Sequence, residues 1–178
     1  MEDKLLIWKL RRGSREALRR MYDKYHADLL KIAVVMTGGM NTAEDIVQEV
    51  FRKFAGRADR LSLSGSLRNY LITSTVNTVR NFRRKQRRHK TQNLDETDHL
   101  PCEQRRPDQW AIMSEQLERL SAAMTSLPYE QREVITLRME ADMTLRKIPE
   151  LQGTSVSTAQ ARYRYGIERL RSLLNGEL

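Results

Sequence analysis

The chain has 178 residues and carries 32 lysines and arginines against 23 acidic residues, a formal net charge of +9. This excess favours a polyanionic partner, either nucleic acid or an anionic membrane surface. The apolar runs are too short to span a membrane, and the single cysteine, Cys102, excludes an internal disulfide and a cysteine-built metal site. Because the acidic N-terminal residues also lack the layout of a signal peptide, we expect a cytoplasmic protein with no membrane insertion.

The first predicted helix is long and amphipathic. Apolar residues recur at steps of three and four from Leu18 to Met36, and Gly38 with Gly39 is expected to end the helix. Asn41, followed three residues later by Glu44, resembles a capping pair that opens a second helix. That second helix has its own apolar stripe, formed by Ile46, Val47, Val50, Phe51 and Phe54.

A polar, serine-rich loop over residues 56–66 precedes a third predicted helix, whose apolar stripe runs from Leu67 to Phe82. This helix continues into residues 80–90, which contain seven lysines and arginines and no acid. Such a surface neutralises phosphates, and Phe82 would place an aromatic ring within reach of a base. The alternative is a solvated, disordered basic tail. We favour the first interpretation because the basic run continues a patterned helix.

Residues 91–109 break the helical pattern, with several acids, two prolines and few apolar side chains, and are predicted to form an extended linker. A further amphipathic helix is expected to begin at Trp110, and Pro128 suits the first turn of the next one. No segment alternates with a period of two, so strands are not expected. The predicted fold is all-α, with a helical module over residues 1–90, the acidic linker, and a second helical module over residues 110–178.

The second module ends in a pattern typical of a helix-turn-helix. Residues 144–152 form a short helix-like segment, Gly153 lies in a turn, and Ser155 or Ser157 can cap the longer helix that follows. That helix is expected to bury a stripe of Ala159, Tyr163, Ile167, Leu170 and Leu174. Its exposed Gln and Arg side chains suit a major groove. A helical hairpin that serves only packing shows the same pattern, but the basic charge balance favours DNA binding.

Three segments, in order, resemble bacterial RNA polymerase sigma factors. Residues 43–51 look like the helix that binds core polymerase, and residues 127–134 resemble the opening of region four. Residues 158–171 are similar to the recognition helix of the small extracytoplasmic-function (ECF) group. The resemblance implies a protein that binds RNA polymerase core enzyme, recognises the minus-ten and minus-thirty-five promoter elements, and initiates transcription.

The resemblance also implies roles for individual residues. Core polymerase would bind Asp45, Gln48 and Glu49. The minus-ten element would bind Arg60, Ser62, Tyr70, Asn77, Arg80, Asn81, Phe82, Arg83, Arg84, Arg87 and Arg88. The minus-thirty-five element would bind Ser157, Thr158, Gln160, Ala161, Arg162 and Arg164. This last set agrees with the chemistry of base edges, because Gln suits adenine and Arg suits guanine.

Several of these residues have other interpretations. Asp45 and Glu49 could form a solvated helix face, and aromatic residues such as Tyr70 and Phe82 belong to a core more often than to a base platform. Arg162 could instead clamp a phosphate or form an internal salt bridge. These alternatives remain open from the sequence.

The chain also departs from the ECF pattern. Pro149 stands where the helix before the turn usually carries Ala, and Gln152 stands where a Leu usually precedes the turn glycine. Proline inside a helix costs on the order of 3 kcal/mol, so we expect that helix to be kinked or to start late. Tyr70 and Asn81 replace a usual Trp and Asp, whereas Asn77 matches. We therefore expect the mechanism to be retained and the promoter preference to differ.

Two rival functions come from other classes. A nucleic-acid enzyme needs clustered carboxylates with metal ions or a nucleophile–base pair. The chain offers no such set and no histidine pair with ligand spacing, so we expect no enzymatic activity, no metal and no cofactor. An autonomous helix-turn-helix regulator, usually a dimer on a palindrome, would bind duplex DNA without polymerase. Whether an anti-sigma factor is a further partner stays open.

Overall fold

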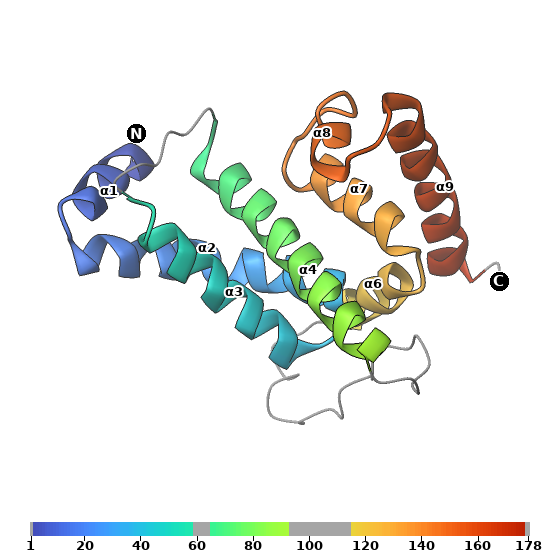
Figure 1. Cartoon of the computed structure of the whole chain (residues 1–178), viewed down its shortest axis with the longest axis horizontal. Helices are drawn as coiled ribbons and strands as arrows, with labels where there is room; N and C mark the ends of the chain where they lie inside the picture. Colours follow the sequence, from blue (N-terminus) through green and yellow to red (C-terminus); the bar gives the residue numbers. More distant parts are fainter. Residues whose placement is uncertain (1, 59–64, 93–114, 177–178) are drawn as a thin grey trace.

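The computed structural model describes residues 2–58, 65–92 and 115–176, and all regular structure within these ranges is helical. The helices are α1 (Glu2–Arg11), α2 (Arg15–Thr37), α3 (Met40–Ala55), α4 (Leu67–Gln92), α6 (Glu115–Thr125), α7 (Tyr129–Met139), α8 (Ile148–Gln152) and α9 (Val156–Asn175). Helices α1 to α4 form one side of the molecule and α6 to α9 the other, with α4 lying between α3 and α7 (Figure 1). The all-α prediction is confirmed.

Helix α1 is an element that the sequence pattern did not predict. Its buried face, formed by Leu6, Ile7 and Leu10, packs on α2. Polar contacts hold its start in place, because the Asp3 carboxylate accepts hydrogen bonds from Lys24 Nζ at 2.7 Å and from the Tyr25 hydroxyl at 2.6 Å. With only 10 residues, α1 depends on this docking for its stability.

The ends of α2 follow from local chemistry. Ser14 caps its N-terminus by accepting a hydrogen bond from the Ala17 N–H at 3.2 Å. Gly38 ends it in the left-handed conformation, with φ of 81°, as predicted. The predicted Asn41–Glu44 capping pair is wrong: α3 begins at Met40, and the extended Gly39 occupies the capping position without a side-chain bond. Asn41 is therefore already inside the helix, where it is exposed.

The core is continuous through both halves of the molecule. One cluster of buried side chains joins residues of α1 to α4 with Tyr129, Val134 and Leu137 of α7. A second cluster packs Val35 of α2 against Met124 and Ile135 of the second half. The predicted modules therefore lie directly against each other, although a linker separates them in sequence.

The helix before the turn starts late, as Pro149 led us to expect. Helix α8 has five residues and carries Pro149 in its first turn, where a helix needs no N–H donor. Residues 144–147 precede it as a turn, so the helix-like segment is shorter than predicted. Gly153 ends α8 with φ of 62°. Of the two candidate caps for α9, Ser155 is the one used, accepting from the Thr158 N–H at 3.1 Å.

The predicted inner stripe of α9 is buried to different degrees. Ala159 is fully buried, and Gly166, which was not predicted to be in the stripe, is also buried. Tyr163, Ile167 and Leu170 are half-buried and pack against the clusters, and Leu174 is half-buried. Tyr163 and Ile167 therefore pack against the core, as predicted, but neither side chain is fully buried.

Some predictions fall on residues outside the described ranges. These are residues 93–109 of the acidic linker, with Cys102, the start of the predicted helix at Trp110, and the candidate site residues Arg60 and Ser62. The first two residues assigned to the linker, Thr91 and Gln92, instead end α4. Within the described ranges, no helix has the length and apolar character needed to cross a membrane.

Candidate functional site

The acidic face of α3 presents two exposed side chains, Asp45 and Gln48, and one that is already paired. Glu49 is half-buried and accepts hydrogen bonds from Arg52 Nε at 2.7 Å and Nη2 at 2.8 Å. Lys53 Nζ lies 3.1 Å from Glu49 Oε1. The hydrogen bonds from Arg52 and then Lys53 lower the pKa of Glu49 to about 2. On the predicted face, the carboxylate of Asp45 is therefore exposed to a partner, whereas the charge of Glu49 is balanced by Arg52 and Lys53.

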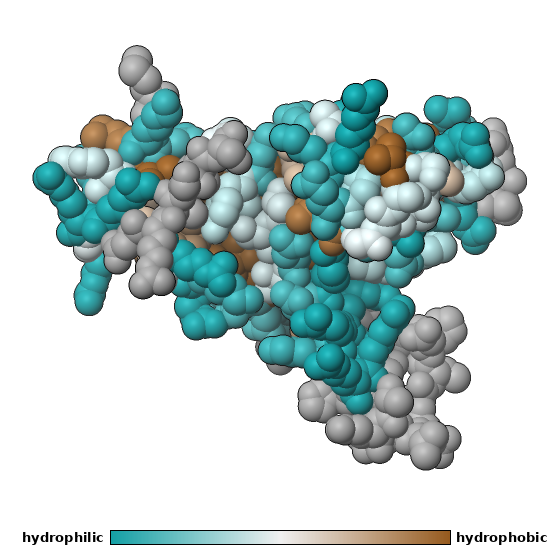
Figure 2. All heavy atoms as spheres, turned by 45° about the horizontal axis from the view of Figure 1, so that its top comes forward, coloured by the Kyte–Doolittle hydropathy of each residue, from teal (hydrophilic) through white to brown (hydrophobic). Residues whose placement is uncertain are grey.

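The end of α4 carries the exposed part of the basic run, and its arginines also line a cleft between α4 and α7. Figure 2 shows hydrophilic side chains gathered over the projecting end of this helix. Arg84, Arg87 and Arg88 are exposed there, together with Asn81, and Phe82 is 37% exposed. The structure thus brings cations and one aromatic ring onto the same helix end, as a single-strand surface requires.

The other aromatic candidate of the first module belongs to the core. Tyr70 is half-buried and packs against the core cluster, with its ring centroid 6.1 Å from that of Phe54. Asn77, one of the polar candidates, is half-buried on the same helix. Of the two rings, Phe82 is the more accessible platform for a base.

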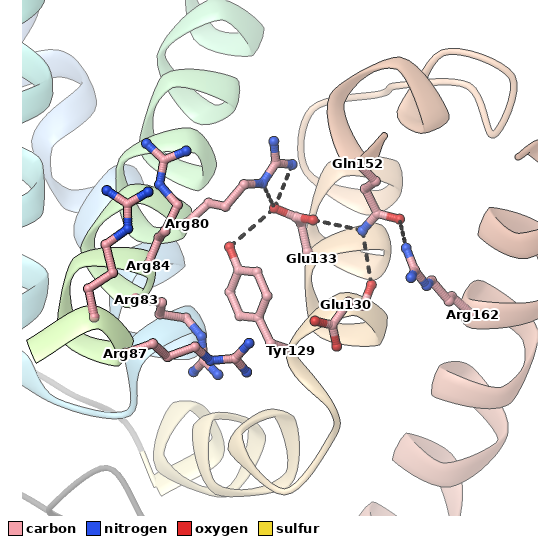
Figure 3. Close-up of a pocket in the computed structure, with 10 residues that line it drawn as sticks. Arg80, Arg83, Arg84, Arg87, Tyr129, Glu130, Glu133, Gln152 and Arg162 are labelled. Atoms are coloured by element: carbon pink, nitrogen blue, oxygen red, sulfur yellow. Dashed lines mark hydrogen bonds and ion pairs between the residues drawn. The ribbon is translucent and has the colours of Figure 1, made fainter. Parts of the chain in front are cut away.

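The inner side of α4 faces α7 and α8 across a cleft of about 440 Å³ (Figure 3). Arg80 donates from Nε to Glu133 Oε1 at 2.8 Å and also bonds the carbonyl oxygen of Leu151. The guanidinium of Arg83 lies 4.5 Å from the centroid of the Tyr129 ring. Burial, with the charge of Glu133, raises the pKa of Tyr129, so its hydroxyl remains a donor to that carboxylate at 3.1 Å. Two of the predicted minus-ten arginines therefore contact the second module.

The first turns of α9 show the predicted minus-thirty-five residues in two settings. Ser157, Gln160 and Arg164 are exposed, whereas Thr158, Ala161 and Arg162 are half-buried. Arg162 donates from Nη1 to the side-chain oxygen of Gln152 at 2.9 Å. Arg164 bonds the hydroxyl of Tyr165 at 3.1 Å. Arg162 thus has an internal partner, an amide and not the carboxylate that a salt bridge would need.

Two family comparisons agree with this arrangement. Residues 21–89 match Sigma-70 region 2, and residues 123–172 match Sigma-70, region 4. The first range takes in most of α2, all of α3 and most of α4, and the second takes in α7, α8 and most of α9. Among similar proteins, the ECF RNA polymerase sigma factor SigX of Bacillus subtilis is 25% identical over 92% of this chain and 88% of its own length. The chain belongs to the ECF group of RNA polymerase sigma factors.

Further relatives extend this finding. The ECF sigma factor SigW of Bacillus subtilis is 24% identical to this sigma factor over 94% of each chain. The sigma factor RpoE of Bartonella quintana, solved with the anti-sigma factor NepR, has a TM-score of 0.67 at 22% identity, covering 88% of this chain and 96% of its own. CnrH, solved with the cytosolic domain of CnrY, has a TM-score of 0.65 at 18% identity over the full length of both chains. These structures share the fold of this sigma factor.

The structure adds residues that the sequence analysis did not single out. Tyr129, Arg132 and Glu133 lie in the segment that resembles the opening of region four, yet all three are buried at the junction with region 2. Arg132 donates to the carbonyl oxygen of Met36, at the end of α2, at 2.6 Å. The sequence did contain a signal for a buried role of Glu133. This residue stands four positions before the inner-face Leu137, which places a carboxylate on an apolar helix face.

Proposed function

We propose that this sigma factor binds core polymerase through the acidic face of α3 and reads the promoter through two surfaces. The exposed end of α4, with the loop before it, would capture the minus-ten element. The first turns of α9 would lie in the major groove of the minus-thirty-five element. The described residues support this division, because Asp45 and Gln48 are exposed on α3 and Gln160 is exposed on α9, each on a helix whose opposite face is buried.

The observation that carries the proposal is the arrangement at the start of α9. Ala159 is fully buried, whereas the neighbouring Gln160 is exposed and Ser157 and Arg164 are exposed on either side of it. An amide and a guanidinium on the outer face of a recognition helix can read adenine and guanine in the major groove. The hydroxyl of Ser157, at the positive end of the helix, can bond a phosphate.

The test is run-off transcription with core polymerase, followed by selection from a library randomised in the minus-thirty-five element. Gln160→Ala and Arg162→Ala should each relax base preference at one or two positions, by about 1–3 kcal/mol of discrimination. Glu168→Ala, an exposed change further along α9, is the control. A uniform loss across all sequences would show phosphate contact only, and an unchanged preference would remove these residues from the site.

The salt dependence of promoter binding tests the α4 surface. Replacing Arg84, Arg87 and Arg88 with Gln should flatten the plot of log affinity against log salt by roughly 0.7–0.9 for each phosphate that is no longer neutralised. A matched control replaces three exposed cations elsewhere, Lys4, Lys9 and Arg19, with Gln and keeps the change in net charge equal. A slope equal to that of the wild type in the α4 variant would refute the phosphate role.

We also propose that an anti-sigma factor is a partner of this protein. Both similar structures are complexes. RpoE was solved with the anti-sigma factor NepR, and CnrH was solved with the cytosolic domain of CnrY. Affinity purification from the native host, followed by run-off inhibition with each captured protein, tests this. Full transcription in the presence of every captured protein would contradict it.

A further inference from the structure

Helix α1, at the end of the molecule opposite α9, exposes two large apolar side chains (Figure 1). Leu5 is 53% exposed and Trp8 is 48% exposed, whereas the other apolar residues of this helix, Leu6, Ile7 and Leu10, are buried. Leu5 and Trp8 are three positions apart, which makes them neighbours on the helix surface. The packing of α1 on α2 does not explain them, because it uses the opposite face of the helix.

Cations surround this apolar pair. The guanidinium of Arg12 lies 3.9 Å from the centroid of the Trp8 ring, and Lys4 and Lys9 are exposed. Helical steps of three and four place these cations beside Leu5 and Trp8. We call the surface formed by Lys4, Leu5, Trp8, Lys9 and Arg12 the outer face of α1.

The acids near this surface already have partners. Lys24 Nζ lies 3.1 Å from Glu2 Oε2 and 2.7 Å from Asp3 Oδ1. Arg20 Nε lies 3.3 Å from Glu16 Oε1. These three acids therefore balance two cations of α2, and the cations on the outer face of α1 are left to attract an external anion.

A mixture of exposed cations, a tryptophan and a leucine suits the surface of an anionic bilayer. Tryptophan prefers the level of the lipid headgroups, because its ring is apolar and its N–H is polar. Lysine and arginine attract anionic headgroups, and an amphipathic helix can lie in the same plane. A nucleic acid could bind the cations and the ring of Trp8, but its charged backbone offers no apolar environment for Leu5. The exposed leucine therefore favours the bilayer.

We propose that the outer face of α1 is a peripheral binding site for an anionic lipid bilayer. Trp8 and Leu5 enter the headgroup region, and the cations around them contact lipid phosphates. The binding is weak and reversible, because it rests on two partly exposed apolar side chains and a few charges. This site goes beyond the proposed function, since none of its residues is assigned to core polymerase or to promoter DNA.

The first test follows the fluorescence of Trp8 in the full-length chain. The other tryptophan, Trp110, is replaced by Phe so that the emission reports Trp8 alone. Phosphatidylcholine vesicles with about one-third phosphatidylglycerol should shift the emission to shorter wavelength, and brominated acyl chains should quench it, because the ring leaves water. Vesicles of phosphatidylcholine alone should do neither. Adsorption through the basic end of α4 would leave the emission of Trp8 unchanged.

The second test measures the partition of the protein onto the same vesicles by co-sedimentation. The double variant Lys4→Gln, Lys9→Gln should lower the partition coefficient by about 25-fold, since each cation contributes about fivefold. Arg146→Gln with Lys147→Gln removes two exposed cations that precede α8 and should have little effect. Added salt should weaken the binding of the wild type, because it screens exposed charges.

Leu5 distinguishes a bilayer from a nucleic acid. Leu5→Gln should lower vesicle binding by about three- to tenfold, because roughly half of this side chain is still exposed and can be buried. Its affinity for a single-stranded oligonucleotide should equal that of the wild type. Met139→Gln, a change at a residue of α7 that is 60% exposed, is the matched control and should leave vesicle binding unchanged. Circular dichroism verifies that each variant is folded.

Several results would overturn this proposal. They are an unchanged Trp8 emission with anionic vesicles, equal binding to vesicles without anionic lipid, and unaltered vesicle binding in either the Leu5 variant or the double lysine variant. Loss of oligonucleotide binding in the Leu5 variant would assign the surface to nucleic acid instead. Failure of the wild type in run-off transcription would contradict the proposed function only, because the vesicle measurements use neither polymerase nor promoter DNA.

Discussion

Asp45 and Glu49 lie about one turn apart on α3 but differ in the charge that they offer a partner. Asp45 is exposed, whereas Glu49 is bonded to Arg52 and paired with Lys53. An incoming basic surface would meet the Asp45 carboxylate directly and would have to compete with two cations at Glu49. Sequence spacing alone predicts equal contributions of the two acids to binding. The contacts of Glu49 with Arg52 and Lys53 predict a larger contribution from Asp45.

We therefore expect Asp45→Arg to weaken binding to core polymerase more than Glu49→Arg. Reversing the open charge replaces attraction by repulsion, for a loss of about tenfold or more in affinity. Titration of labelled core enzyme measures it, with Asp23→Arg, an exposed acid on α2, as the control. Equal losses for the two α3 variants would contradict the ranking.

The pairing of Glu49 also has a consequence for pH. Its pKa in the folded protein is about 2, below the ordinary value of 4.5. The stabilisation from its ion pairs is therefore complete above pH 4.5 and is lost as the pH falls toward 2. A carboxyl NMR titration should show this pKa, and the double variant Arg52→Gln, Lys53→Gln should return it toward 4.5. An unchanged titration in that variant would assign the shift to another cause.

At the scale of elements, α7 and α9 pack closely at Gly166. A Cβ atom added there would lie 2.9 Å from Ile135 Cδ1 and 3.1 Å from Gln131 Cβ. Glycine in mid-helix is unfavourable by roughly 0.5–1 kcal/mol relative to alanine. The close contact explains why glycine occurs at this position despite that cost. This contact sets how α9 lies on α7.

Gly166→Val should destabilise the protein by about 1–3 kcal/mol, because the added methyl groups overpack the crossing. Urea unfolding measures the loss, and Arg169→Val, at an exposed position of the same helix, controls for the lower helix propensity of valine. Adding Ile135→Ala should recover part of the loss through a favourable coupling between the two sites. Additive effects of the two changes would refute the crossing contact.

At the scale of the whole molecule, Arg132 fastens region 4 to the end of α2. The last carbonyl groups of a helix lack internal partners, and a cation there also complements the helix dipole. Arg132 donates to the carbonyl oxygens of Met36, Thr125 and Leu127 at 2.6, 2.8 and 3.1 Å. Burial, with the nearby charge of Arg83, lowers its pKa to about 10, so it is still a cation at neutral pH.

Arg132→Met should lower the free energy of unfolding by at least about 1–3 kcal/mol, the range for one buried polar group left without a partner. Arg138→Met, an exposed change on the same helix, should have little effect. Urea unfolding of both variants provides the comparison. If they are equally stable, the Met36 carbonyl finds another partner and Arg132 does not fasten the modules.

Features that depend on residues a few positions apart could be predicted from the sequence. The stripes of α2 and α3, the end of α2 at Gly38 and the late start of α8 around Pro149 all follow from helical periodicity or from backbone restrictions. The predicted stripe of α4 holds at Leu67 and Leu71 but is wrong beyond them, because Val76 and Val79 are buried and Phe82 is exposed. Local chemistry also misled at Asn41, because a polar residue with an acid three positions later fits a cap that Gly39 already fills.

The contacts between the modules depend on tertiary packing. Arg80 and Glu133 are separated by 53 positions, and Arg132 and Met36 by 96, so no local pattern brings them together. The arginines of one basic run consequently line the same cleft to different depths, with Arg80 and Arg83 half-buried against α7 and Arg84, Arg87 and Arg88 exposed. The sequence predicts that both α4 and α9 read DNA. Only tertiary packing decided that Arg80 and Arg162 are connected through Glu133 and Gln152, because these residues lie on four helices that no local pattern brings together.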